Sequence, residues 1–204
     1  MDMNYKAIIF DLGGVILNID YNRTKVAFEN LGLSNFDDLY SQAAQSRIFD
    51  RFEVGDISAQ RFVNELLNYL PKGTTANQVV EAWNSMLLDL PKENLQLLSR
   101  LKQETRTFLL SNTNEIHVEC FNRILRKNSA HNNLNPYFEK AYFSHILGKR
   151  KPEPETFLHL CRLHNLNVGE TLFIDDSYQH IEGANKAGLI THHLKANESI
   201  LDLF

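Results

Sequence analysis

Three carboxylates follow two short apolar runs of the sequence. Asp11 comes after the run 6–10, and Asp175 and Asp176 come after the run 171–174. Runs of this kind are typical of buried β-strands, and ligands of open α/β sheets bind beyond the carboxyl ends of the strands. Two adjacent acids in such a place repel each other unless a cation neutralises them. The pattern therefore predicts an oxygen-rich site that suits Mg²⁺.

Two further polar segments also follow apolar runs. Ser111 and Asn112 come directly after the run 105–110, and Lys151 follows the run 140–143 after a loop. A hydroxyl and backbone amides at a helix start, together with a lysine, neutralise a bound phosphate. With a metal and a carboxylate nucleophile, such groups carry out phosphoryl transfer. Each segment taken alone also has a structural interpretation, as a helix cap, a solvated lysine or a turn.

The elements that must position these residues alternate along the chain. Apolar runs separated by helical patterns indicate βαβ units and a parallel sheet with both faces covered. The predicted fold class is therefore α/β, with a Rossmann-like parallel-sheet core. The expected strands are residues 6–10, 105–110, 140–143, 171–174 and 189–193, and the expected core helices are residues 93–103, 115–126, 153–164 and 178–187.

A long segment separates the first two expected strands and exceeds a single crossover connection. It contains helical patterns and no convincing strand, so we expect an α-helical cap inserted into the core. Ser58 suits the N-cap of one of its helices. The expected domains are a core of residues 1–18 and 89–204 and a cap of residues 19–88. Within the cap, the helical patterns lie at 24–31, 36–47, 59–70 and 77–88, with a turn at 51–56.

The composition excludes several classes of protein. The chain has 204 residues, of which 43% are hydrophobic and 23% are charged, and its net charge is -4. A negative net charge argues against nucleic acid as the main partner, and no stretch approaches the roughly 18 apolar residues of a membrane span. The first residues do not resemble a signal peptide, and two cysteines make no disulfide framework. We expect a cytoplasmic protein, a monomer or a homodimer.

Four motifs occur in an order that resembles the haloacid dehalogenase superfamily. They are Asp11-Leu12-Gly13-Gly14-Val15, Ser111-Asn112, Lys151-Pro152 and Asp175-Asp176. Each motif is weak alone, but the four together are specific and extend over nearly the whole chain. The expected helical insertion resembles the small α-helical cap of that superfamily. The stretches 11–20, 53–58, 111–114 and 181–185 look closest to bacterial members that include a glucose-1-phosphate phosphatase.

The resemblance implies a nucleophile and a set of metal ligands. Asp11 would attack phosphorus, carry an aspartyl-phosphate and also bind Mg²⁺. The carbonyl oxygen of Gly13 would be another ligand of the metal. Asp176 would bind the metal directly, and Asp175 would bind it directly or through water.

The resemblance also implies a phosphate site. Ser111 would act in catalysis by holding the transferring phosphoryl oxygens, together with the backbone amide of Asn112. Gly14 belongs to the same expected phosphate site. Lys151 would bind the phosphate and offset the charge of Asp11, and stabilisation of charge in this way usually contributes most to catalysis.

The sequence departs from the superfamily at one position. Its phosphatases usually carry a second aspartate two residues after the nucleophile as the general acid and base, and here that residue is Gly13. General acid–base help is worth about 10²–10⁴ in rate, so water, the substrate or another side chain must supply the proton. Asp20 is a candidate, and as an acid it would matter most for poor leaving groups. Its place before Tyr21 also suits a hinge or a helix cap, which we favour.

The cap offers candidate contacts to the rest of the substrate. Arg47 and Arg51 have the charge to bind an anion, and Glu53 can accept hydrogen bonds from sugar hydroxyls. Ordinary solvated side chains at helix ends are the alternative for all three. Trp83 suits the apolar core of the cap better than a platform for a sugar.

These features predict a Mg²⁺-dependent phosphatase that acts on a small phosphorylated metabolite such as a sugar phosphate. A phosphosugar mutase or phosphotransferase of the same fold is one alternative. A regulatory protein that binds a phosphorylated ligand with weak turnover is another. A haloalkanoic acid dehalogenase is disfavoured, because those enzymes need no metal, whereas Asp175 and Asp176 indicate one.

Overall fold

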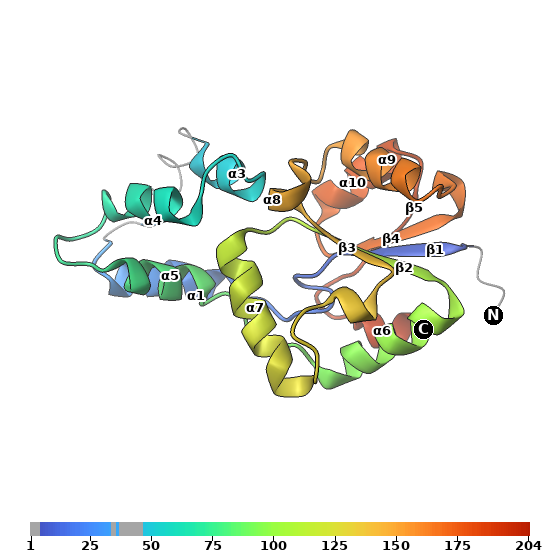
Figure 1. The fold of residues 1–204 in the computed structure, drawn as a ribbon, viewed down its shortest axis with the longest axis horizontal. Coiled ribbons are helices and arrows are strands. Elements are labelled where there is room, and N and C mark those ends of the chain that lie inside the picture. The colour runs from blue at the N-terminus through green and yellow to red at the C-terminus, as the bar shows by residue number, and fades with distance from the viewer. Residues whose placement is uncertain (1–4, 34–35, 37–46) are drawn as a thin grey trace.

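The computed structural model describes residues 5–33, 36 and 47–204, and its centre is a five-stranded parallel sheet (Figure 1). The strand order is β3-β2-β1-β4-β5, so successive strands are added on one side of β1 and then on the other. Sites of open α/β sheets lie where the order reverses in this way. The strands are β1 (Ala7–Phe10), β2 (Arg106–Ser111), β3 (Lys140–Phe143), β4 (Thr171–Asp175) and β5 (Ile190–His193).

Helices cover both faces of the sheet, as the alternating pattern predicted. Ile8 and Phe10 of β1 pack in one apolar cluster with α6 and α7, whereas Ala7 and Ile9 pack in another with α9 and α10. A strand that is buried on both faces reads as a continuous apolar run, which is why β1 was visible in the sequence. The four helices are α6 (Lys92–Glu104), α7 (Glu115–Asn128), α9 (Pro154–Leu163) and α10 (Tyr178–Lys186).

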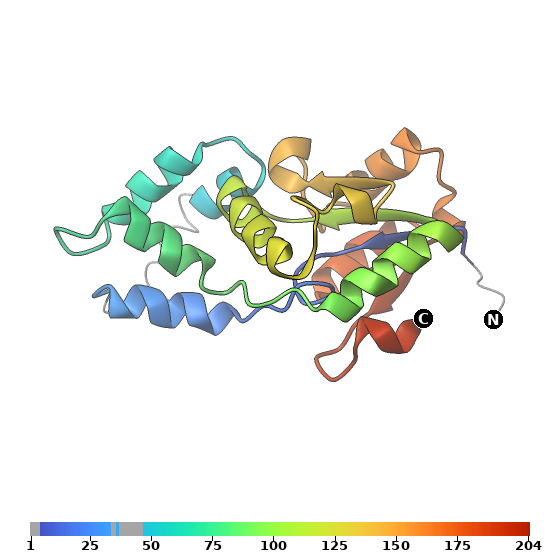
Figure 2. The same cartoon turned by 60° about the horizontal axis from the view of Figure 1, so that its bottom comes forward.

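The helices between β1 and α6 form a second layer of structure beside the sheet (Figures 1 and 2). They have an apolar cluster of their own, which includes Phe28, Phe52, Phe62 and Val79. Ser58 caps α4 by accepting a hydrogen bond from the amide of Arg61 at 3.3 Å, as predicted. The described helices of this part are α1 (Tyr21–Asn30), α3 (Ile48–Glu53), α4 (Ala59–Leu67) and α5 (Ala76–Asn84).

Some of the expected boundaries differ from the structure. The helix expected at 36–47 lies almost entirely outside the described residues. The turn expected at 51–56 begins later, because α3 continues to Glu53 and buries Ile48 and Phe52 one helical turn apart. The short helix α8 (Ser144–Leu147) was not predicted, since four residues are too few to establish a helical period.

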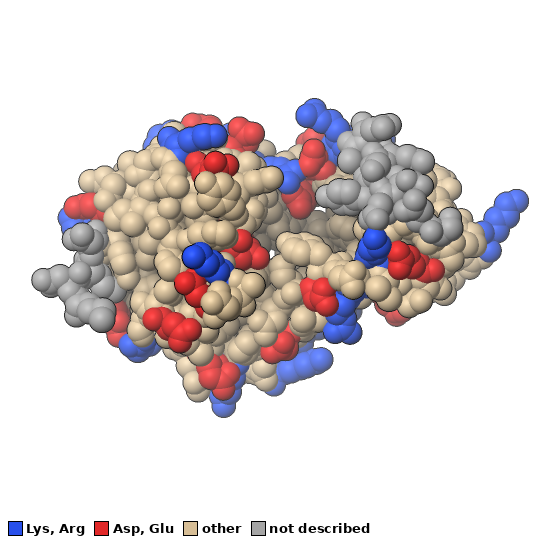
Figure 3. Space-filling model, turned by 180° about the vertical axis from the view of Figure 1, so that it is seen from behind, with Lys and Arg blue, Asp and Glu red and all other residues tan. Residues whose placement is uncertain are grey.

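The helical segment between β1 and α6, which we call the cap, contacts the sheet-containing core through backbone as well as side chains. Gly55 has φ +77°, and a Cβ placed on it would lie 2.1 Å from the carbonyl oxygen of His145 in α8. Arg150, next to the predicted phosphate lysine, forms ion pairs with Asp50 and with Glu53 of α3, the latter at 3.0 Å. The surface is hollowed where the two parts meet (Figure 3).

In the described part of the chain, no helix combines the length and the apolar composition that crossing a membrane requires.

Candidate active site

The carboxyl ends of β1 and β4 bring the three predicted carboxylates together. The two strands pair in parallel with Phe10 opposite Ile174, so Asp11 and Asp175 leave the sheet side by side. One carboxylate oxygen each of Asp11, Asp175 and Asp176 can be chosen so that all three lie within 4.8 Å of one another. Three carboxylates at this separation repel one another unless cations lie nearby, and an all-oxygen donor set is one that can hold Mg²⁺.

Gly14 makes room for one of these carboxylates. Its φ of +74° is unfavourable for other residues, and a Cβ built on it would lie 2.1 Å from Oδ2 of Asp176. A Cβ on Gly13 would lie 3.1 Å from Cδ1 of Ile19, so the side chain of Ile19 fills the space above this position. The glycine pair therefore allows the carboxylate cluster to form, and a contact of Gly14 with phosphate stays a prediction.

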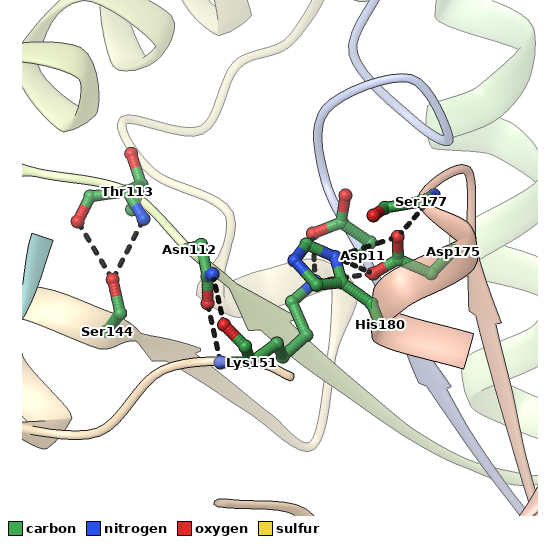
Figure 4. Close-up of polar contacts among 8 residues, drawn as sticks. All are labelled: Asp11, Asn112, Thr113, Ser144, Lys151, Asp175, Ser177 and His180. Carbon is green, nitrogen blue, oxygen red and sulfur yellow. Dashed lines mark hydrogen bonds and ion pairs between the residues drawn. The ribbon is translucent and has the colours of Figure 1, made fainter. Parts of the chain in front are cut away.

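Lys151 lies between two of the carboxylates. Its side chain is fully buried, and Nζ donates to Oδ1 of Asp11 and to Oδ2 of Asp175, each at 2.6 Å (Figure 4). Burial disfavours a charged ammonium group, but the attraction of the two carboxylates holds the pKa of Lys151 above its ordinary value. The interpretation of Lys151 as a solvated surface lysine is therefore wrong.

The side chain of Asn112 holds the backbone of Lys151 in place. Its Nδ2 donates to the carbonyl oxygen of Lys151 at 2.9 Å, and its Oδ1 accepts from the amide of Lys151 at 3.0 Å. Helix α10 approaches the next residue closely, since a Cβ on Gly183 would lie 1.9 Å from the carbonyl oxygen of Pro152. The loop after β2 and helix α10 thus hold the backbone around the lysine, and the predicted phosphate contact of Asn112 is left to its backbone amide.

The carboxylate of Asp175 accepts hydrogen bonds from several groups. Besides Lys151, it accepts from the amide of Ser177 at 2.8 Å, and Nδ1 of His180 lies 3.0 Å from both of its oxygens (Figure 4). Burial raises the pKa of Asp175, but Lys151 and His180 outweigh burial and lower it. His180 was not among the predicted site residues, and its signal in the sequence was its position in the first turn of the helix that follows the acidic pair.

The ionised form of Asp11 is less well stabilised by its surroundings than that of Asp175. Burial raises the pKa of Asp11 to about 6, and the charge of Asp175 adds to this effect, while Lys151 opposes it. A carboxylate in this state gains most from a further cation nearby. The charge balance thus favours a metal ion beside Asp11 and Asp176.

The loop after β2 is held at the same edge of the sheet. Ser111 is buried at the end of β2, opposite Phe143 of β3. Ser144 donates to the carbonyl oxygen of Thr113 at 3.0 Å and accepts from its amide at 2.9 Å (Figure 4). Asn114 caps α7, which confirms the helix-cap interpretation for that residue of the segment.

Two predicted side chains lie apart from the carboxylates. Asp20 is exposed and caps α1 by accepting from the amide of Asn22 at 3.0 Å, which confirms the capping interpretation. Arg51 lines a cavity of ≈ 400 Å³ with Arg47 and Arg150, and none of the three carboxylates lines that cavity. The structure therefore does not bring Arg51 to the site.

Two larger cavities flank the site where the cap meets the core. One of ≈ 580 Å³ is lined by the loop after β2, by Glu53 and by aromatic side chains of the cap, including Trp83. The other, of ≈ 900 Å³, is lined by Gly14, Asp176 and residues after β5. Trp83 also packs against the cap core, as predicted, so it belongs both to that core and to the wall of the first cavity.

A neutral histidine joins α7 to the cap. The ring of His117 stacks on Trp83 with centroids 5.2 Å apart, and its Nε2 lies 3.2 Å from the carbonyl oxygen of Trp83. Its Nδ1 lies 3.2 Å from Nδ2 of Asn114, which can only donate, so Nδ1 accepts. Burial lowers the pKa of His117 to about 4.

We expect His117 to make the fold less stable in mild acid. The unfolded chain takes up a proton near the ordinary pKa of 6.5, whereas the folded chain resists protonation down to about 4. The free energy of unfolding is therefore highest above pH 6.5 and falls as the pH drops towards 4, by up to about 3 kcal/mol from this group. Urea denaturation across this range should show a shallower pH dependence for His117→Gln, whereas His131→Gln, at an exposed position, should match the wild type. Equal slopes in all three would contradict the assignment.

Comparison with known proteins agrees with this arrangement. Residues 5–188 match the model of the haloacid dehalogenase-like hydrolases. A D-ribitol-5-phosphate phosphatase of Bacteroides thetaiotaomicron is 32% identical over 186 residues, which cover 91% of this chain and 90% of that protein. A sesquiterpene phosphatase of Aspergillus oryzae is 25% identical over 201 residues, covering 95% and 92% of the two chains.

A solved structure of a haloacid dehalogenase family enzyme from Bacteroides thetaiotaomicron, in complex with magnesium and inorganic phosphate, has a TM-score of 0.86. It is 34% identical and covers 98% of this chain and 99% of that one. The fold and the carboxylate site define an α/β enzyme with its centre at the carboxyl ends of a parallel sheet. The chain belongs to the haloacid dehalogenase-like hydrolase family, and within it to the phosphatases.

Proposed function

We propose that this enzyme is a Mg²⁺-dependent phosphatase that hydrolyses the phosphate ester of a small metabolite through an aspartyl-phosphate on Asp11. The observation that carries the proposal is the buried ammonium group of Lys151 between Asp11 and Asp175, inside a cluster of three carboxylates. The solved relative with magnesium and inorganic phosphate and the phosphatase names of the curated relatives support it.

The donor set fits a magnesium ion. Asp11 and Asp176 would hold it together with the main-chain carbonyl of Gly13, and the space that Gly14 leaves for Asp176 is part of this cradle. The oxygens of Asp175 already accept from Lys151, Ser177 and His180, so we assign it a contact through water. When bound, the ion supplies positive charge that stabilises the negative charge on the phosphoryl group.

Each side chain of the site then has a separate role in the proposed reaction. Lys151 holds the carboxylate of Asp11 ionised and aimed, and an oxygen of Asp11 forms a bond to phosphorus as the bond to the leaving oxygen breaks. The hydroxyl of Ser111 and the amide of Asn112 hold the phosphoryl oxygens during transfer. Water then attacks phosphorus, which releases phosphate and restores the carboxylate of Asp11.

We propose a polyol or sugar phosphate as the substrate. Glu53 lines the cavity beside the site and is fixed by Arg150 at 3.0 Å, which leaves a carboxylate to accept hydrogen bonds from hydroxyl groups. The curated relative that acts on a phosphorylated pentitol supports this class. We also propose that residues 19–88 form the cap and that the enzyme works in the cytoplasm, where its unpaired Cys120 and Cys161 suit a reducing medium.

Phosphate release from a panel of esters tests the proposed function. We expect release from D-ribitol 5-phosphate, hexose phosphates or both, and a slower release from farnesyl phosphate, whose chain carries no hydroxyls for Glu53. Removal of Mg²⁺ with a chelator should abolish release, and added Mg²⁺ should restore it. Dependence on a sugar bisphosphate would instead favour the mutase. Binding of phosphate without release from any ester would favour the regulatory protein.

A further inference from the structure

Cleavage of an alkyl phosphate must place a proton on the oxygen that leaves phosphorus. Of the groups already assigned, Asp11 is the nucleophile and Lys151 is fully buried between two carboxylates. Gly13 has no side chain, and Ile19 fills the space above it. The donor must therefore come from elsewhere in the site.

Two acids near the site are engaged with other partners. Asp20 accepts from the backbone of α1 and is exposed. Glu53 lines the first cavity and is paired with Arg150 at 3.0 Å; burial raises the pKa of Glu53 and outweighs the charge of Arg150, which lowers this pKa. Both acids are therefore held by other groups of the protein, and Glu53 is the alternative donor that the test must separate from Tyr21.

Tyr21 stands where the two flanking cavities meet. Among the described residues, it and Asn22 line both the cavity that contains Asn112 and the cavity that contains Asp176. It is the first residue of α1, directly after the segment that leads from the sheet into the cap. Its side chain is 68% exposed, so the phenol is open to a bound molecule instead of being packed in a core.

We propose that Tyr21 is a catalytic residue that gives its hydroxyl proton to the leaving oxygen. This inference rests on the proposed function. In the first step, an oxygen of Asp11 bonds to phosphorus, the bond to the leaving oxygen breaks, and that oxygen takes the proton of Tyr21. In the second step, the phenolate of Tyr21 takes a proton from the attacking water, whose oxygen bonds to phosphorus as the bond to Asp11 breaks. The alcohol and hydrogen phosphate are the products, and both side chains return to their starting forms.

The charges around Tyr21 agree with this role. Partial burial and the nearby carboxylates of Asp176, Asp11 and Glu53 raise the pKa of Tyr21. The hydroxyl therefore keeps its proton in the resting enzyme and is available as a donor.

The test compares an alkyl ester, such as D-ribitol 5-phosphate, with p-nitrophenyl phosphate, whose leaving group needs no proton. We expect Tyr21→Phe to lower kcat/KM for the alkyl ester about 100-fold and to change kcat/KM for the aryl ester less than about threefold. Because p-nitrophenolate leaves without taking a proton, Tyr21 keeps its own proton with this ester and cannot act as a base in the second step, so kcat for the aryl ester should also change by less than about threefold. Tyr69→Phe, at an exposed position of the cap, is the matched control and should behave as the wild type.

The remaining outcomes are distinct. Equal losses with both esters, or no loss with either, would overturn the role of Tyr21 while leaving the proposed function intact. A leaving-group-dependent loss in Glu53→Gln, with none in Tyr21→Phe, would transfer the role to Glu53 and also overturn it. A wild-type enzyme that releases phosphate from no ester would overturn both this inference and the proposed function.

Discussion

Replacing Asp11 with asparagine is expected to lower phosphate release by about 10⁴-fold or more, the scale seen when a covalent nucleophile is removed. The amide has nearly the same shape as the carboxylate, but its oxygen is a poor nucleophile and carries no charge for a metal ion. Lys151 keeps Asp175 as a partner at 2.6 Å, so its buried ammonium group stays paired with a carboxylate. The loss would therefore be chemical and not a consequence of unfolding.

The same change should leave the metal-free protein at least as stable as the wild type. The pKa of Asp11 is raised to about 6 from 3.8 in the folded state, so ionised Asp11 reduces stability above pH 6, and this cost disappears as the pH falls below 3.8. Removing the charge should raise the free energy of unfolding at pH 8 by up to about 3 kcal/mol. Active sites often lower the stability of the fold in this way, which is known as the trade-off between stability and activity.

Kinetics, acid-quench mass spectrometry and denaturation together check this prediction. The wild type should carry a phosphoryl group after rapid quenching with substrate, and Asp11→Asn should not. Asp56→Asn, an exposed aspartate of the cap, is the control and should keep wild-type turnover. If Asp11→Asn retained more than about a hundredth of the activity, Asp11 would not be the nucleophile.

Replacing Lys151 with methionine is expected to damage both activity and stability. Methionine has a similar length and is unbranched, but it leaves Asp11 and Asp175 buried without their shared cation. Breaking a buried pair in this way costs about 3–5 kcal/mol. We expect the free energy of unfolding at pH 8 to fall by this amount and phosphate release to fall by at least about 10³-fold, since the loss of one electrostatic donor alone costs about 10²–10³.

The pH dependence distinguishes lost charge from lost packing. Without Lys151, the pKa of Asp11 rises further above its unfolded value, so the folded variant gains protons as the pH falls and recovers stability. The difference from the wild type should therefore be smaller at pH 5 than at pH 8. Lys149→Met, two residues earlier, should change neither property. A difference that stays constant between pH 5 and pH 8 would mean that packing and not charge explains the loss.

Strands and their adjoining acids were open to prediction because they are local patterns. Strand β1 is buried on both faces and is apolar throughout, and Asp11 follows it directly. Parallel strands deliver the residues at their carboxyl ends to one edge, so Asp11 and the pair Asp175-Asp176 were expected to meet before their distances were known. A turn around Gly55 was also predicted, although the sequence did not show that α3 continues to Glu53.

Other features depend on contacts between segments that are distant in the sequence, so they could not be predicted from it. Nothing near Lys151 indicates full burial, which arises because Asn112 holds its backbone and Gly183 lets α10 approach Pro152. His180 was missed for a similar reason, since its partner is fixed by the orientation of α10 against β4.

The sequence by itself thus determined the parallel sheet, the helical insertion and the groups for phosphoryl transfer, because each of these follows from a pattern of residues that are close together in the chain. The tertiary structure alone decided which of those groups are buried, paired or free. It made Asp20 a helix cap, placed Arg51 in a separate cavity and set Tyr21 between the two cavities beside Asp176. The physical reason is that burial and charge pairing are properties of neighbours in space, and the chain brings those neighbours together only when it folds.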